Sequence, residues 1–146
     1  MKMKKLVCLL SALLMMMCSS CSLRGNKLYD IDFKTYTSET LQIVTEKANY
    51  SVDDTVIRYS VTNVGETEEC IAADDACFEL HKLVDGEWKC VGTKTEHYWN
   101  DLALILNPGQ GETREIPLDE YYHLPLDEGE YRIAIERLVS ESFVIS

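Results

Sequence analysis

Residues 126–135 carry the pattern that most restricts the fold of this chain, because an acidic turn is followed there by a run in which every second side chain is apolar. That spacing is typical of a half-buried β-strand. Residues 136–141 can turn the chain back, so a second strand is expected beside the first. We expect the upstream chain to cover the apolar face that these strands share. Its side chains are Tyr131, Ile133 and Ile135 on the first strand and Phe143 and Ile145 on the second.

The middle of the chain repeats this alternation between turn signals. Residues 40–47 and 55–63 each place apolar side chains at every second position, which predicts two further strands. Asp85-Gly86 tolerates positive φ and separates residues 78–80 from residues 88–91. A two-residue connection of this kind is a strong signal for a β-hairpin.

Residues 102–106 alternate again and lead into the turn Asn107-Pro108-Gly109, in which proline restricts φ and glycine frees it. No segment after residue 21 has a convincing helical period over three turns, although residues 98–106 can form one short helical turn. We therefore predict about seven or eight short strands in an all-β antiparallel sandwich.

The first 20 residues have the plan of a signal peptide, with basic, apolar and small residues in that order. The apolar run at residues 6–17 would span only ~18 Å as a helix, well short of the ~30 Å hydrocarbon core of a membrane. Small serines precede Cys21, and this arrangement resembles the lipobox of bacterial lipoproteins. Cys18 is the alternative acylation site, because Cys21 lacks the leucine that commonly stands three residues earlier. We expect a palmitate-type lipid anchor in the cell membrane, on its extracytoplasmic face; the alternative is an ordinary secreted protein.

These features divide the chain into a signal peptide at 1–20, a flexible tether at 21–38 and one domain at 39–146. Removal of the signal peptide takes away three of the 14 basic residues and none of the 25 acidic ones, which leaves a formal charge of −14. Such a surface repels nucleic acid, so nucleic-acid binding is not expected.

Several short motifs together resemble the bacterial immunoglobulin-like domains found in lipoproteins of Gram-positive bacteria. The resemblance covers roughly residues 39–146 and implies an immunoglobulin-like β-sandwich, with Tyr131 as the corner tyrosine that ties a loop to the next strand. It implies little about activity. The motifs are Tyr59-Ser-Val-Thr-Asn63, Phe78-Glu-Leu-His-Lys82, Asp85-Gly-Glu-Trp88, Leu106-Asn-Pro-Gly109, the strand at 126–133 and Phe143-Val-Ile145.

Three cysteines follow Cys21, and an odd number leaves one thiol free if two of them pair. We expect a disulfide between Cys70 and Cys77. Pairing of Cys77 with Cys90 is the alternative, although the hairpin turn at Asp85-Gly86 places Cys90 opposite His81. The third possibility is that these cysteines form no disulfide and are buried free thiols. The spacing fits no zinc signature and no calcium loop, so neither a metal site nor any other cofactor is expected.

No sequence motif of a nucleophile with its base is present, so we predict that the chain is not an enzyme. Its candidate contact residues are the aromatic side chains Tyr98, Trp99, Tyr121 and Tyr122, with the reservation that some of them fill the end of the sandwich. The predicted function is a surface-anchored binding or structural module that contacts a protein or glycan through loops around 65–77 and 94–101. The alternative is a protease inhibitor that inserts the 70–77 loop into an active-site cleft.

Overall fold

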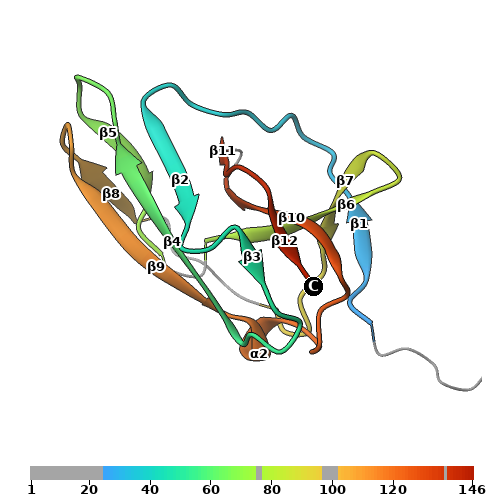
Figure 1. The fold of residues 1–146 in the computed structure, drawn as a ribbon. Helices are drawn as coiled ribbons and strands as arrows, with labels where there is room; N and C mark the ends of the chain where they lie inside the picture. The colour runs from blue at the N-terminus through green and yellow to red at the C-terminus, as the bar shows by residue number, and fades with distance from the viewer. Residues whose placement is uncertain (1–24, 75–76, 97–101, 137) are drawn as a thin grey trace, which may run out of the picture.

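A computed structural model describes residues 25–74, 77–96, 102–136 and 138–146 of the chain (Figure 1). Almost all regular structure in these residues is strand, and the predicted all-β class is confirmed. No helix among them has the length and apolar character needed to cross a membrane. The elements are β1 (Leu28–Asp30), β2 (Leu41–Thr45), β3 (Asn49–Tyr50), β4 (Val56–Asn63), β5 (Glu69–Ala72), β6 (Glu79–Val84), β7 (Glu87–Val91), β8 (Ala103–Leu106), β9 (Gly111–Pro117), α2 (Leu118–Tyr121), β10 (Gly129–Ile135), β11 (Leu138–Val139) and β12 (Phe143–Ile145).

The strands form one large sheet and two smaller ones. The large sheet has the order β1-β7-β6-β10-β12-β3. Its seventh strand, β11, also pairs with β10 but is not part of this linear order. The smaller sheets are β2-β4-β9 and β5-β8. Strand pairing is antiparallel except between β12 and β3, which run parallel. This arrangement confirms the predicted immunoglobulin-like sandwich, in which Figure 1 shows β2, β4 and β9 apart from β6, β10 and β12.

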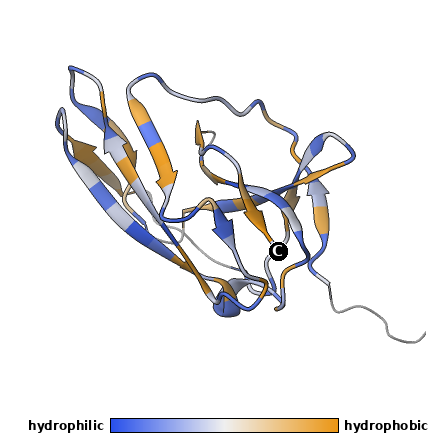
Figure 2. Ribbon diagram, in the orientation of Figure 1, coloured by the Kyte–Doolittle hydropathy of each residue, from blue (hydrophilic) through white to orange (hydrophobic). Residues whose placement is uncertain are grey.

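The core lies between the sheets, and strands such as β2, β4, β9 and β12 contribute alternate side chains to it. On β4, for example, Ile57, Tyr59 and Val61 are buried, whereas Arg58 between them is exposed. Figure 2 shows the same alternation as bands of hydrophobic colour along the strands. The largest fully buried side chains are Tyr59, Tyr122, Tyr131, Phe143, Ile57, Leu80, Leu106, Ile116, Leu118, Ile133, Ile145 and His81.

The two C-terminal strands have the predicted arrangement. Tyr131 on β10 lies opposite Phe143 on β12, and their rings stack at a centroid distance of 6.2 Å. The hydroxyl of Tyr131 donates a hydrogen bond of 2.6 Å to the carbonyl oxygen of Asp127. Tyr131 therefore links the turn before β10 to the strand itself, as expected of a corner tyrosine.

The hairpin between β6 and β7 also follows the prediction. Asp85 and Gly86 both have positive φ, at 51° and 81°. Positive φ at both central residues is the requirement of a type I′ turn, whose twist matches that of the flanking strands. The resulting register places Cys90 directly opposite His81.

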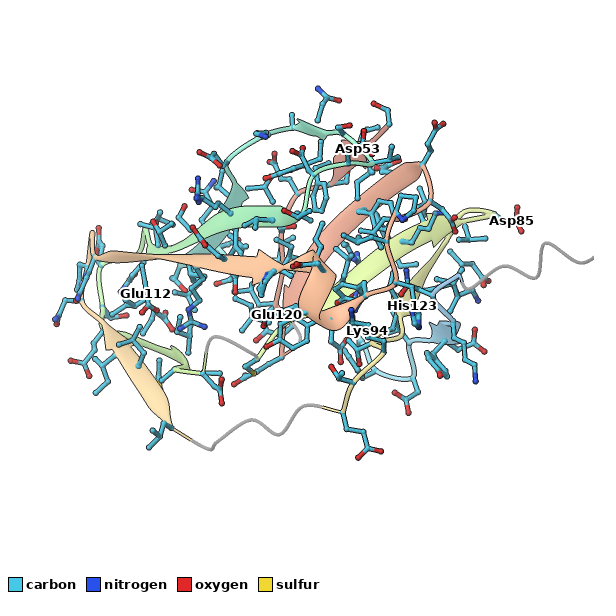
Figure 3. The ribbon with its side chains drawn as sticks, turned by 90° about the horizontal axis from the view of Figure 1, so that it is seen from below. Asp53, Asp85, Lys94, Glu112, Glu120 and His123 are labelled. Atoms are coloured by element: carbon cyan, nitrogen blue, oxygen red, sulfur yellow. The ribbon has the colours of Figure 1, made fainter. Side chains whose placement is uncertain are left out.

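Part of the predicted tether at residues 21–38 is instead built into the sandwich. β1 pairs with β7 and forms one edge of the large sheet. Before it, the Asn26 amide exchanges two hydrogen bonds of 2.8 Å with the backbone of His123, which Figure 3 labels. After it, Tyr36 forms an isolated bridge with Leu138. All three residues of β1 are exposed, so it has no apolar alternation from which the sequence could predict a strand.

The described part of the segment at 98–106, where the sequence allowed a helical turn, is a strand. Residues 103–106 form β8, whereas residues 97–101 lie outside the described part of the chain. The short helix α2 follows Pro117 instead, and its Leu118 is buried in the core.

Candidate functional site

Four functional side chains lie in neighbouring positions on the outer face of the large sheet. Leu80 on β6 points into the core, so Glu79 and His81 on either side of it point to the other face. The register places His81 between Cys90 of β7 and Arg132 of β10. The position of Cys90 opposite His81 was predicted from the sequence. The position of Arg132 beside His81 could not be predicted, because it results from the pairing of β10 with β6.

His81 is fully buried and has a polar partner on each ring nitrogen. Its Nε2 lies 2.9 Å from Oε2 of Glu79, and Nε of Arg132 donates a hydrogen bond of 3.3 Å to its Nδ1. Because an arginine nitrogen can only donate, Nδ1 must be the acceptor and Nε2 must carry the proton. His81 therefore links an acidic and a basic side chain.

Two further contacts hold Arg132 in place. Its guanidinium carbon lies 4.4 Å from the ring centroid of Trp88, and its Nη2 donates a hydrogen bond of 3.0 Å to Oγ1 of Thr35. Burial lowers the pKa of Arg132 below its ordinary value. Thr35 belongs to the N-terminal segment predicted to be a tether, so this segment contributes to the site.

Cys90 lies beside the histidine, and its properties are those of a protonated thiol. One ligand atom from each of Glu79, His81 and Cys90 lies within 4.8 Å of the other two. Burial, with a smaller contribution from the charge of Glu79, raises the pKa of Cys90 to about 11. A nucleophilic cysteine needs a lowered pKa instead. The three side chains therefore offer sulfur, nitrogen and oxygen ligand atoms but no activated nucleophile.

The predicted disulfide between Cys70 and Cys77 is not formed in the structure, where both residues and Cys90 are free thiols. Cys70 lies on β5 next to the buried Ile71, and strand alternation turns it outward, so it is exposed. Cys77 is buried, and burial raises the pKa of its thiol. The cross-link that motivated an inhibitory 70–77 loop is thus absent, and Asp75 and Ala76 of that loop lie outside the described residues.

The structure also corrects the predicted aromatic contact surface. Tyr122 is 1% exposed and belongs to the core. Tyr121 is half-buried and packs edge-on against Phe78, with ring centroids 5.1 Å apart. Both side chains are held inward because α2 follows β9 directly and carries the chain across the end of the sandwich. Tyr98 and Trp99 lie outside the described residues.

Ala73 of the predicted 65–77 contact loop lies beside Leu102, the residue that follows the predicted 94–101 loop. Ala73 donates a backbone hydrogen bond of 2.8 Å to the carbonyl oxygen of Leu102. Leu102 is 65% exposed. Ile105, the third residue of β8, is 52% exposed. At the other end of β5, Glu66 and Glu68 are exposed. This side of the molecule therefore combines acidic and apolar side chains.

A shallow groove lies on the outer face of the sheet β2-β4-β9 and was not predicted from the sequence. Its volume is about 260 Å³. An ion pair of 2.5 Å between Arg58 and Glu115 crosses the same face. The groove has no buried charge, since the side chains of this pair are both 53% exposed. Its lining residues are Val44, Thr45, Glu46, Arg58, Tyr59, Ser60 and Thr113.

Arg114 is a second feature that the sequence did not reveal, because it occupies an inward position on β9. Its side chain is buried, and its Nη2 donates to Oε2 of Glu112 at 2.7 Å and to the carbonyl oxygen of Ala72 at 2.8 Å. These contacts compensate a charge whose burial would otherwise be costly. Arg114 therefore joins β9 to β5 across the boundary between two sheets.

Comparison with known proteins identifies a family for this chain. A family model described as "Bacterial Ig-like domain" matches residues 37–143. No curated protein matches the chain. Among solved structures, a β-glucosidase from Erythrobacter marinus is similar at 16% identity with a TM-score of 0.40, over 72% of this chain and 15% of that one. This likeness is too loose to bear on activity.

Proposed function

This chain belongs to the bacterial immunoglobulin-like domain family, and from that premise we propose that it is a non-catalytic binding or structural module anchored outside the cytoplasmic membrane by a lipid on Cys21. The family match over residues 37–143 is the observation that supports a binding or structural module. The signal-peptide plan of the first 20 residues supports the anchor. Cys18 is the alternative acceptor of the lipid.

A non-catalytic role agrees with the chemistry of the site on the large sheet. Within the described ranges, Cys90 and His81 are the one cysteine and histidine that the strand register places opposite each other. The raised pKa of Cys90 keeps this thiol protonated near neutral pH. His81 is closed between Glu79 and Arg132, so it is not open to a substrate.

We expect the anchor to depend on one cysteine. Replacing Cys21 with serine should abolish incorporation of labelled palmitate and release the protein from the membrane fraction, because serine offers no thiol for the thioether-linked lipid. Replacing Cys18 with serine is the matched control and should leave both properties unchanged. Labelling that persists in Cys21→Ser and disappears in Cys18→Ser would move the anchor to Cys18; a wild-type protein that incorporates no palmitate would refute the lipoprotein.

For the contact surface we propose the side of β5 and β8, with a partner that presents basic residues. A hydrogen bond joins Ala73 of the predicted 65–77 loop to Leu102, the residue that follows the predicted 94–101 loop, and exposed Glu66 and Glu68 give that side a negative charge. The charge of −14 on the predicted mature chain points to the same kind of partner.

Charge reversal tests this surface. The double substitution Glu66→Lys and Glu68→Lys should reduce cross-linking of the anchored protein to its neighbours at the cell surface. For the wild-type protein, the yield of cross-linked product should fall as the salt concentration is raised. Asp53→Lys is the control, because Asp53 is an exposed acid in the turn between β3 and β4 (Figure 3). Equal loss in the control and the double variant would show that net charge matters and this surface does not.

A further inference from the structure

We propose that Glu79, His81 and Cys90 form a binding site for a divalent cation of the zinc class. One ligand atom from each residue lies within 4.8 Å of the other two. Around a tetrahedral zinc, with ligand bonds of about 2.0–2.3 Å, neighbouring ligand atoms are roughly 3.5 Å apart. Small side-chain rotations therefore bring all three atoms into coordination distance, and a water molecule completes the site as the fourth ligand.

The backbone holds these residues in the required relation without help from a loop. Glu79 and His81 are two positions apart on β6, so they share one face of the sheet, and Cys90 is the cross-strand neighbour of His81 on β7. Both strands lie inside the large sheet, with β10 and β1 on either side. The site is thus built on the most regular part of the fold, which is where a ligand set is held most accurately.

The ligand types select the cation. A thiolate and an imidazole favour zinc and its neighbours among the transition metals, whereas calcium and magnesium require oxygen ligands. His81 is fully buried, but the Glu79 side chain is 27% exposed, so it provides the route of entry for the cation. On binding, the Cys90 thiol releases its proton to solvent and the thiolate takes its place as ligand.

Arg132 is the group that competes with the cation. In the structure it donates to Nδ1 of His81, which leaves the proton on Nε2. Coordination through Nε2 requires that proton to move to Nδ1, where it would face the Arg132 donor. Arg132 must then turn away from His81, while its contacts with Trp88 and Thr35 can retain it at the site. Removal of this donor should therefore favour metal binding.

Titration of the reduced full-length protein with Co²⁺ tests the site, because cobalt replaces zinc and gives a charge-transfer absorption when it binds a thiolate. We expect one equivalent to bind with this absorption, and Zn²⁺ to displace it. Cys90→Ser should abolish the absorption, and His81→Gln should weaken Zn²⁺ binding by at least the roughly 10–100-fold typical of losing a supporting residue. Cys70→Ser removes the exposed thiol and is the matched control that should bind as the wild type does.

Two further measurements keep the proposal falsifiable if the Cys90 or His81 variant fails to fold. X-ray absorption of the zinc-loaded wild-type protein should show one sulfur ligand at about 2.3 Å, with the remaining ligands nitrogen or oxygen at about 2.0 Å. Arg132→Met preserves much of the aliphatic stem and should tighten Zn²⁺ binding, an effect that a purely structural role of Arg132 would not produce. Oxygen and nitrogen ligands alone, or cobalt absorption that survives in Cys90→Ser, would overturn the site.

Discussion

Replacing Asn63 with alanine is expected to lower the free energy of unfolding by about 3 kcal/mol, because three hydrogen bonds, one buried and two part-buried, depend on this one buried side chain. Asn63 is fully buried at the end of β4. Its Nδ2 donates to the carbonyl oxygens of Thr67 at 2.7 Å and Leu106 at 2.8 Å, and its Oδ1 accepts from the amide of Gly65 at 2.9 Å. Alanine would leave these groups without partners in a region that water does not reach freely.

The backbone of Asn63 also pairs with Gln110 and Gly109 in the turn before β9, and alanine would keep these two hydrogen bonds. The loop after β4 and the turn after β8 are therefore held by a single residue. Urea unfolding measures the change. Asn49→Ala is the control, because Asn49 is exposed on β3 and should shift stability by no more than about 0.5 kcal/mol. A loss below about 1 kcal/mol for Asn63→Ala would mean that water replaces the lost bonds.

Replacing Ile133 with alanine is expected to cost about 4 kcal/mol, toward the upper end of the range for buried isoleucine. Ile133 is fully buried on β10, which pairs with β6, β11 and β12 and so lies at the centre of the large sheet. It stands opposite Leu80, another fully buried side chain. Because strands on both sides fix the backbone here, the core cannot collapse readily into the space that alanine would leave.

Chemical and thermal unfolding of Ile133→Ala should show this loss with an unchanged dependence on denaturant, as expected if the fold is retained. Val144→Ala is the matched control, because Val144 lies on the neighbouring β12 but is 40% exposed. We expect it to cost less than about 1 kcal/mol. Similar losses for the two variants would contradict the central position of Ile133 in the core.

Much of this fold could be predicted because strand alternation is a local property. The buried faces of β2, β4, β10 and β12 are visible as apolar residues at every second position, and the type I′ turn at Asp85-Gly86 sets its register by itself. From that turn alone the sequence placed Cys90 opposite His81, which the structure confirms. Half of the candidate metal site was thus visible before the strands were assembled.

The remainder depended on contacts between segments far apart in the chain. Arg132 forms hydrogen bonds with His81, which is 51 positions away in the sequence, and with Thr35, which is 97 positions away. A local sequence pattern cannot indicate contacts between residues so far apart in the chain. The edge strand β1 is exposed along its length and is held by backbone pairing with β7. It therefore has no alternation of apolar side chains from which the strand could be predicted. The same reason explains why residues 28–30 of the predicted tether proved to be part of the sheet.

The sequence by itself determined the all-β class, the strands with a buried face and the turns between them, because each follows from side chains within a few positions of one another. Only the tertiary structure decided which side chains are covered. It buried Tyr122, which polar neighbours made look like a loop residue, and turned Cys70 away from the buried Cys77. Burial is a property of the packed sheets, and so is the meeting of Glu79, His81, Cys90 and Arg132 on one face.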